Sequence, residues 1–287
     1  MKELLSVEPI NIKIAKDYRI VQSKLVINSG DVILLTGPNG CGKSTVIKIL
    51  MGDVFDYSGL DYGGSSALFY KNGNEYRILE KQSDMDMFRN SVCYVSQDDE
   101  FESESLLDCF MSSIERYDIP NKEKYIFDFL IKHSAFESFY FRDDAIKLGF
   151  CARRVAKKIG LKISKLSLKE KKSLLLMTMN VKRMSGGQRK LSNILTNLIR
   201  YEYCSLLIMD EPLNNLDYKN VRAFSNILTS IYKDKPELGI LMVTHCRSIP
   251  IINKVYEIDP VNKRVQSGAA YKCNSCFGEI DSEGYYI

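Results

Sequence analysis

Continuous apolar runs of strand length recur along the chain, separated by stretches with the spacing of a helix. The clearest runs are "DVILLT" at 31–36, "CSLLIM" at 204–209 and "GILMV" at 239–243. Uninterrupted apolar runs of this length are typical of parallel strands that are buried on both faces. Helical spacing appears instead in "STVIKILMG" at 44–52 and "QRKLSNILTNLIRY" at 188–201. The pattern predicts an α/β fold built on a parallel sheet.

Two further patterns add an antiparallel layer and a helical insertion. "ALFYKNGNEYRIL" at 67–79 alternates apolar and polar residues on both sides of "KNGNE", which predicts a hairpin. Residues 125–141 carry seven aromatic residues, and apolar positions there keep helical spacing. The simpler interpretation of this segment is the core of a helical subdomain, and the alternative is a docking groove for a partner.

A phosphate-binding loop follows the first apolar run. "GPNGCGKS", Gly37 to Ser44, fits G-x-x-x-x-G-K-[ST] between a predicted strand and a predicted helix. Glycines allow the backbone N–H groups to surround phosphates, and the helix N-terminus adds positive charge. We expect Lys43 to reach the β- and γ-phosphates and the Ser44 hydroxyl to bind Mg²⁺. The loop predicts that the chain binds a nucleoside triphosphate.

Two carboxylates end another apolar run. In "YCSLLIMDEP", at 203–212, Asp210 and Glu211 come at the carboxyl end of the predicted strand. Open α/β sheets bind ligands at that edge. Asp210 is expected to hold Mg²⁺ through water. Glu211 is positioned as the general base that polarises an attacking water.

A second glycine-containing loop precedes the helix predicted at 188–201. In Ser185-Gly186-Gly187-Gln188, the serine resembles an N-cap and the glycines allow the backbone to approach an anion closely. One nucleotide does not need two such loops from one chain. A two-fold dimer would bring the loop of one subunit onto the γ-phosphate that the other subunit holds.

These motifs together resemble those of ATP-binding cassette (ABC) ATPases, over roughly residues 10–260. "GPNGCGKST" resembles Walker A, "VCYVSQ" the Q-loop, "MSGGQ" the signature and "LLIMDEP" Walker B. "NNLD" resembles the D-loop, and "VTH" the segment that ends in the switch histidine. The resemblance implies a RecA-like P-loop core with an antiparallel β layer and an inserted helical subdomain. Met184 replaces the usual signature leucine.

The resemblance also implies roles for individual residues. The catalytic residues would be Glu211, His245, Lys43 and Gln97, and Mg²⁺ would be held by Ser44, Gln97 and Asp210. Tyr18, 25 residues before Lys43, lies where the family keeps an aromatic that stacks on adenine. ATP would be bound by the side chains and backbone of Tyr18, Gly37, Asn39, Gly40, Cys41, Gly42, Lys43, Ser44, Thr45, Ser185, Gly186, Gly187, Gln188 and Asp217.

The domain limits follow from the same motifs. Residues 1–97 and 185–262 are expected to form the ATPase core and residues 98–184 the helical subdomain. From Gln97 to Ser185 there are 88 residues, so this subdomain is longer than in compact cassettes. Residues 263–287 form a tail in which Cys273 and Cys276 resemble half of a zinc site. A structural zinc site needs four ligands, so two free cysteines are the favoured interpretation.

Composition bears on where the protein works. Hydrophobic residues make up 45% and charged residues 26%, as in ordinary soluble domains. No apolar run approaches the roughly 20 residues that a membrane-spanning helix needs. The eight cysteines lie mostly inside apolar stretches, which suits reduced, buried thiols. We expect a cytoplasmic protein, either free or held peripherally on the inner face of the cell membrane by a partner.

The net charge of +4 hides a strongly basic segment. Residues 147–190 hold fourteen Lys or Arg and one acid, Glu170, for a local charge of +13. Such a segment is either a solvated face or a contact for nucleic acid, anionic lipid or an acidic partner. The favoured function is the ATPase subunit of an ABC transporter, which dimerises, as a homo- or heterodimer, around two ATP and drives separate membrane subunits. The alternative is a soluble cassette ATPase that acts on nucleic acid or in a defence or assembly complex.

Overall fold

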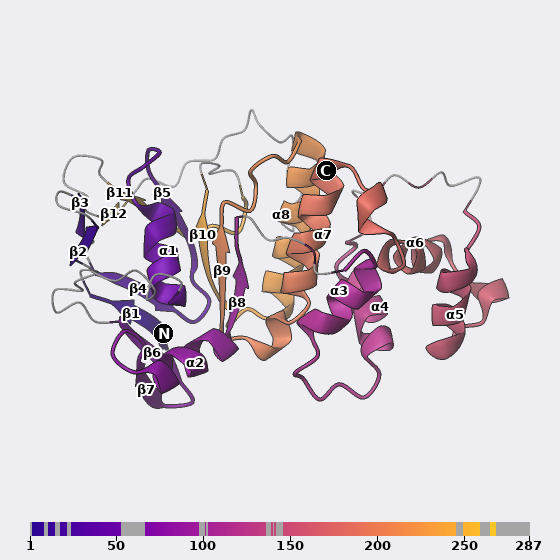
Figure 1. The fold of residues 1–287 in the computed structure, drawn as a ribbon, viewed down its shortest axis with the longest axis horizontal. Helices are drawn as coiled ribbons and strands as arrows, with labels where there is room; N and C mark the ends of the chain where they lie inside the picture. Colours follow the sequence, from indigo (N-terminus) through magenta and orange to yellow (C-terminus); the bar gives the residue numbers. More distant parts are fainter. Residues whose placement is uncertain are drawn as a thin grey trace. The chain divides into compact units, whose positions relative to one another are not determined.

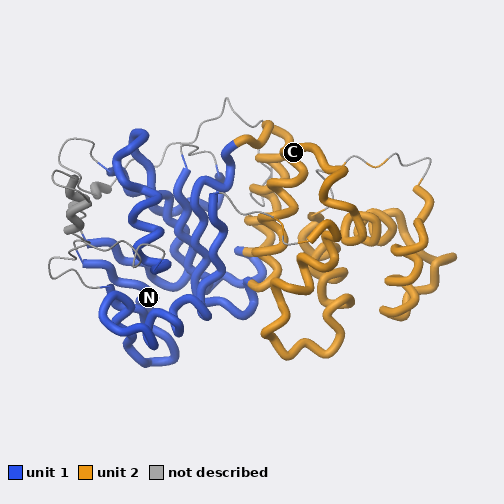
Figure 2. The backbone as a smooth tube through the Cα atoms, in the orientation of Figure 1, with its two compact units in different colours: residues 1–97, 201–214, 232–276 blue, residues 98–200, 215–231, 277–287 orange. Residues whose placement is uncertain are grey.

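The computed structural model of the 287-residue chain describes residues 2–8, 11–14, 18–21, 24–52, 67–97, 101, 103–135, 139, 141, 146–244, 249–258 and 265–267. Its chain divides into two compact units (Figure 2). Unit 1 comprises residues 1–97, 201–214 and 232–276, and unit 2 comprises residues 98–200, 215–231 and 277–287. The described strands, labelled in Figure 1, all belong to unit 1 together with two α-helices, and the other α-helices lie wholly or mostly in unit 2.

A largely parallel sheet forms the centre of unit 1, in the order β12–β11–β5–β10–β9–β8. All strands in it are parallel except β12, which pairs antiparallel with β11. Every residue of β5, β9 and β10 is buried, which confirms the interpretation of the continuous apolar runs. The strands are β5 (Val32–Thr36), β8 (Val92–Val95), β9 (Leu206–Asp210), β10 (Gly239–Val243), β11 (Lys254–Ile258) and β12 (Val265–Ser267).

An antiparallel sheet provides the second layer, in the order β4–β1–β6–β7. The predicted hairpin is confirmed: β6 and β7 pair across a turn in which Asn72 and Gly73 have φ of 53° and 84°. Positive φ at both residues is typical of a type I′ hairpin turn. The strands are β1 (Glu3–Val7), β4 (Leu25–Asn28), β6 (Ala67–Lys71) and β7 (Asn74–Arg77), and β2 (Asn11–Ile14) and β3 (Tyr18–Val21) form a separate pair.

Helix α1 (Lys43–Met51) joins the two sheets through one apolar core. Val46, Ile47 and Leu50 of α1 lie in the same buried cluster as residues of β5 and of the antiparallel layer. Phe69 packs edge-on against Phe88 of α2 (Gln82–Ser91), with ring centroids 5.1 Å apart. Helix α1 ends at Gly52, which has φ 75°. The core fixes the helix that carries Lys43 and Ser44.

Unit 2 consists of helices around a second apolar core. Phe110, Ile126, Leu130, Leu174 and Leu195 are among its fully buried residues. His133 is buried and lies 2.8 Å from the Ser230 hydroxyl, in keeping with a packing role. The elements are α3 (Leu106–Ser113), α4 (Lys122–Lys132), α5 (Phe150–Lys158), η2 (Ile163–Lys165), α6 (Leu168–Met177), η3 (Val181–Arg183) and α7 (Gly186–Leu198). Helix α8 (Tyr218–Asp234) belongs to unit 2 up to residue 231, and η4 (Tyr201–Tyr203) belongs to unit 1.

Two predictions about organisation can be compared with these units. Unit 2 is larger than the helical subdomain predicted at 98–184, because it also takes in α7 and most of α8. The two units are defined by how the chain packs, whereas the predicted limits describe domains. The predicted domain limits therefore stay a prediction. In the described part of the chain, no helix combines the length and the apolar composition needed to cross a membrane.

Candidate nucleotide-binding site

The loop between β5 and α1 has a backbone that requires glycine. Gly37 has φ 151°, and a Cβ placed on it would lie 2.9 Å from the Cys41 sulfur and 3.1 Å from the Ile258 carbonyl oxygen. Gly42 has φ 104° and stands at the N-cap of α1. Residues with a side chain rarely adopt these conformations. The Cys41 side chain is buried in the core of unit 1, so this residue holds the loop against the core.

Lys43 holds its ammonium group over this loop. Its Nζ donates hydrogen bonds to the carbonyl oxygens of Gly37, at 2.9 Å, and Pro38, at 3.2 Å. The side chain is only 6% exposed, so its positive charge is concentrated in the loop. A buried ammonium surrounded by backbone dipoles is suited to binding an anion such as a phosphate.

Ser44 and Asp210 meet across the sheet, although 166 positions separate them. The Ser44 hydroxyl donates a hydrogen bond of 2.9 Å to Asp210 Oδ1. Ser44 lies in the first turn of α1, and Asp210 is the last residue of β9. Asp210 is 1% exposed, so its carboxylate is held inside the protein. Two oxygen ligands of the type that Mg²⁺ prefers are thereby brought together.

Glu211 directly follows Asp210 in an uncommon backbone conformation. Its φ is 49°, in the left-handed region that costs a non-glycine residue about 1–3 kcal/mol. The conformation is held by its N–H group, which donates to the Val243 carbonyl at 2.9 Å, and by its carbonyl, which accepts from Asn214 N–H at 3.2 Å. Strain of this kind concentrates at functional sites. It turns Glu211 away from the path of the strand.

Lys43, Ser44 and Glu211 line one cavity of about 510 Å³ in unit 1, and Asp210 bonds to Ser44 beside it. Eight of its nine lining residues were predicted from the sequence; Thr45 and Gln97, for instance, meet Lys43 and Glu211 there. Asn214 was missed, although it is a polar residue just after the strand-end acids, in the "NNLD" segment. The cavity is lined by Asn39, Gly40, Gly42, Lys43, Ser44, Thr45, Gln97, Glu211 and Asn214.

The glycine pair lies in unit 2, at the start of α7. Ser185 is the N-cap: its hydroxyl accepts from Gln188 N–H at 3.3 Å, and Gln188 Oε1 accepts from Ser185 N–H at 3.1 Å. This reciprocal capping box confirms the predicted N-cap. Gly186 opens the helix with open space around it. The Gln188 side chain is therefore used in the cap, and its contact with a nucleotide stays a prediction.

Gly187 packs closely against Asn220 of α8. A Cβ on Gly187 would lie 2.6 Å from Asn220 Nδ2, so only glycine fits without a shift. Asp217 caps α8 by accepting a 2.8 Å hydrogen bond from Asn220 N–H. Asn220 links the glycine pair to the loop that carries Asp217, because its side chain packs on Gly187 and its N–H group donates to Asp217. The sequence analysis missed Asn220; its only signal is its position three residues after Asp217.

Four predicted residues have side chains outside the described part of the structure. His245 lies in residues 245–248, and Cys273 and Cys276 lie in the tail, all outside the described residues. Tyr18 is in β3, where the backbone alone is described. The predicted roles of these residues stay predictions.

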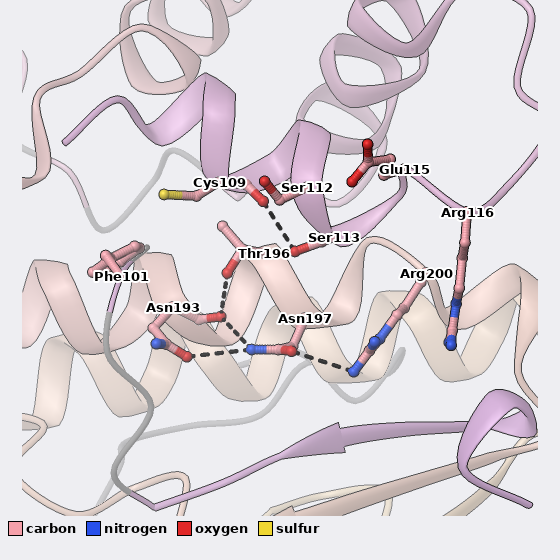
Figure 3. A pocket seen from close by; sticks show the side chains of 10 residues that line it. All are labelled: Phe101, Cys109, Ser112, Ser113, Glu115, Arg116, Asn193, Thr196, Asn197 and Arg200. Atoms are coloured by element: carbon pink, nitrogen blue, oxygen red, sulfur yellow. Dashed lines mark hydrogen bonds between the residues drawn. The ribbon is translucent and has the colours of Figure 1, made fainter. Parts of the chain in front are cut away.

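A separate hollow of about 520 Å³ lies within unit 2, between α3 and α7 (Figure 3). Its wall on α7 is polar: Asn197 Nδ2 donates to the Asn193 carbonyl at 3.1 Å, and Arg200 donates to Asn197 Oδ1 at 3.4 Å. Arg116 stands at the same end as Arg200 (Figure 3). No residue predicted for the nucleotide lines it. The lining residues are Phe101, Cys109, Ser112, Ser113, Glu115, Arg116, Asn193, Thr196, Asn197 and Arg200.

Comparison with known proteins agrees with this geometry. A family profile described as "ABC transporter" matches residues 21–214. The zinc uptake system ATP-binding protein ZurA of Listeria innocua is 25% identical over 265 residues, covering 92% of this chain and 85% of that protein.

Solved structures show the same fold. Part of the ABC transporter complex cbiONQ of Clostridium perfringens, cbiO1, is 20% identical with a TM-score of 0.64, covering 93% of this chain and 89% of the other. An ATP-binding cassette solved as a dimer in a post-hydrolysis state, bound to ADP and Pi, is 14% identical with a TM-score of 0.61, covering 93% and 99%. The predicted fold class, an α/β P-loop core with an antiparallel layer and helices, is confirmed.

Proposed function

The chain belongs to the ABC transporter family, and from this premise we propose that it drives a separate membrane subunit by dimerising around two ATP. The chain is an ATP-binding and ATP-hydrolysing cassette of that family. The observation that carries the proposal is the single cavity that unites Lys43, Ser44, Gln97 and Glu211. Its place of work is the cytoplasmic face of the membrane that holds the partner.

ATP is bound mainly through its phosphates. The Lys43 ammonium neutralises the β- and γ-phosphates, and the N–H groups of the loop from Gly37 to Thr45 surround them. Gly40, Cys41 and Gly42 act through their backbone, because glycine has no side chain and Cys41 is buried in the core of unit 1. Asn39 belongs to the same loop and is exposed at the cavity. Tyr18 stacks on the adenine. The conformation of Gly37 and Gly42 supports this role, because the loop is already shaped to present its backbone.

Mg²⁺ fits the oxygen atoms that lie beside this loop. The Ser44 hydroxyl and the Asp210 carboxylate are hydrogen-bonded to each other, and the Gln97 side chain belongs to the same cavity. We assign these three residues to Mg²⁺, with Ser44 as a direct ligand and Asp210 acting through water. The ion would supply positive charge that screens the phosphates when they are attacked.

Hydrolysis requires a base beside the γ-phosphate. Glu211 accepts a proton from the attacking water, and Gln97 orients that water. His245, which comes two residues after β10 in the sequence, donates a hydrogen bond to the γ-phosphate. The left-handed conformation of Glu211 supports its role, because it directs this residue to the cavity instead of along the strand.

A second subunit completes each site. Ser185, Gly186, Gly187 and Gln188 of one chain approach the γ-phosphate held by the other, together with Asp217. The close packing of Gly187 on Asn220 supports this arrangement, because it makes the glycine pair and the Asp217 loop one rigid surface. The residues 1–97 and 185–262 form the ATPase core, residues 98–184 the helical subdomain and residues 263–287 the tail.

The membrane subunit binds to the helical subdomain. The hollow between α3 and α7 supports this proposal, since it offers a concave polar surface that no nucleotide residue occupies (Figure 3). Arg116 and Arg200 favour an acidic side chain from the partner. Binding of nucleic acid through residues 147–190 and of zinc through Cys273 and Cys276 stay predictions that rest on sequence alone.

The Glu211→Gln variant tests this function. Loss of the base should slow ATP hydrolysis by about 10²–10⁴ while ATP binding persists, because the charge change leaves the phosphate loop intact. The chain is tagged, recovered from its host with ATP and Mg²⁺, and the proteins that co-purify are identified. A protein with several membrane spans is the expected partner.

A matched variant makes the test specific. Arg116→Glu in the Glu211→Gln background should lose the partner yet retain ATP-dependent dimerisation, because Arg116 lies in unit 2 and outside the nucleotide cavity. Recovery of nucleic acid or soluble proteins alone would reject the transport role and favour the soluble alternative.

A further inference from the structure

Residues 147–169 form a basic surface on unit 2. It begins before α5, follows that helix and continues through η2 to the first turn of α6. We use the name basic surface for its exposed side chains, which are Lys147, Arg153, Arg154, Lys157, Lys158, Lys162, Lys165 and Lys169. No acidic residue occurs between positions 147 and 169.

Three acidic residues in the described part of unit 2 already have partners. Glu123 forms an ion pair with Lys158, and Glu104 forms one with Lys182. The hydrogen bond from Lys182 holds the pKa of Glu104 below its ordinary value, so this acid remains ionised and engaged. Glu170 closes the capping box of α6 with Ser167. Among the described residues, no ion pair involves Lys147, Arg154 or Lys157, so much of the positive charge faces solvent.

Apolar side chains are exposed within the same surface. Phe150, the first residue of α5, is 82% exposed, and Leu168 at the start of α6 is 44% exposed. Cys151 is also exposed, contrary to the expectation that it is buried. Phe150, Arg154 and Val155 are among the residues that line a hollow of about 540 Å³. Exposed apolar residues interspersed with Lys and Arg are typical of segments that lie in a membrane interface.

We propose that the basic surface binds the anionic headgroups of a lipid bilayer, with Phe150 inserted beside them. The choice of lipid rests on the proposed function, which brings the chain to a membrane. Cytoplasmic loops of membrane proteins carry on average an excess of Lys and Arg, so they are disfavoured as the occupant of a surface with eight basic side chains, whereas one acidic side chain can still meet Arg116 and Arg200. The cytoplasmic leaflet carries negative charge and attracts it.

The composition of the surface disfavours nucleic acid. Proteins that bind single strands use several aromatic residues on which successive bases stack. In the described part of the surface, Phe150 is the one aromatic side chain. A single inserted aromatic together with diffuse positive charge matches the interface of a bilayer better than a row of bases.

Vesicle binding by the purified full-length chain tests the proposal. The probe is phosphatidylcholine vesicles with and without phosphatidylglycerol, and the measurement is co-sedimentation. The chain should bind only the anionic vesicles, and the triple variant Lys147→Glu, Arg154→Glu, Lys157→Glu should bind at least about 100-fold more weakly, since each basic residue contributes a factor of roughly five. A control with the same charge change elsewhere, Lys2→Glu, Lys81→Glu, Lys233→Glu, should bind within a few-fold of wild type, because those side chains are exposed in other regions.

A fluorescent reporter places the contact at Phe150. The chain contains no tryptophan, so Phe150→Trp introduces a single tryptophan, whose emission can be excited selectively over that of the tyrosines. Its emission should shift to the blue with anionic vesicles, because the indole leaves water. Tyr203→Trp, at a partly exposed site in unit 1, should show no shift.

Three results would overturn the proposal. They are equal binding by the two triple variants, no blue shift at position 150, or binding to an oligonucleotide or to poly-glutamate without binding to vesicles. The vesicles contain no membrane subunit, and capture of that subunit is measured separately with Glu211→Gln. A failure here therefore leaves the transport role standing, and a failure there leaves the lipid result standing.

Discussion

The two glycine-containing helix starts, at α1 and at α7, are built in opposite ways. Helix α1 has Gly42 at its N-cap, with φ 104° and no side-chain cap. Helix α7 has Ser185 at its N-cap and a complete capping box with Gln188. The first turn of any helix has N–H groups without intrahelical partners. At α1 these groups are presented to a ligand, whereas at α7 the chain satisfies part of them itself.

This difference shows that glycines before a helix can serve two different structural roles. At α1 they give the loop positive φ values that wrap backbone around a phosphate. At α7 one of them permits close packing, because Gly187 touches Asn220. The first loop can bind an anion within its own unit. The second is a preformed, rigid edge, which suits a surface that meets a nucleotide held by another subunit.

The largest effect is expected from Gly37→Ala. The new Cβ would meet the Cys41 sulfur and the Ile258 carbonyl while the backbone is held at positive φ. The free energy of unfolding should fall by about 1–3 kcal/mol. ATP affinity should fall at least about tenfold, because the shifted loop would lose some 1.4 kcal/mol of binding free energy. Chemical denaturation and nucleotide titration measure the two effects.

Gly40→Ala is the matched control for the same loop. Gly40 also has positive φ, at 75°, but a Cβ there would have nothing within 4 Å. Only the backbone cost, about 1–2 kcal/mol, should remain. Equal loss of stability in the two variants would mean that close packing does not explain Gly37.

An intermediate effect is expected where Gly187 meets Asn220. Gly187→Ala should destabilise the chain, because its new Cβ would clash with Asn220, and Asn220→Ala should relieve that clash. The double variant should therefore be more stable than the sum of the two single effects predicts. The coupling energy should be about 1–2 kcal/mol, within the range for residues in contact. Denaturation of the four proteins of the cycle measures it. Additive effects would show that the two residues do not limit each other.

The smallest effect is expected from Ser185→Ala. Loss of the cap should lower the free energy of unfolding by about 1 kcal/mol. Hydrolysis should fall further, because the loop would no longer be rigid when it meets the partner's nucleotide. Ser167→Ala removes a similar capping box, on α6, and should cost similar stability without slowing hydrolysis. Equal rates in the two variants would argue against a role for Ser185 at the nucleotide.

Much of the nucleotide cavity was predicted because its parts are local. The strand β5, the loop and α1 follow one another within residues 32–51, so short-range backbone preferences set their geometry. The acids after β9 and the cap at Ser185 were predicted for the same reason. Asn214 was missed although it lies in the "NNLD" segment, because only Asp217 of that segment was given a role, and Asn220 was missed because it matters only through its contact with Gly187.

The sequence by itself determined the phosphate loop, the strand-end acids, the hairpin and the capped helix, since each depends on residues a few positions apart. Only the tertiary structure decided that Ser44 bonds to Asp210, because that contact requires β9 to lie beside β10 and β10 beside β5. Strand order is a property of the whole sheet, and the sequence of a buried apolar strand does not identify which strand lies beside it. The same holds for the exposure of Phe150 in the basic surface: helical spacing leaves open whether a neighbouring element covers a side chain, and the packing of unit 2 leaves this one uncovered.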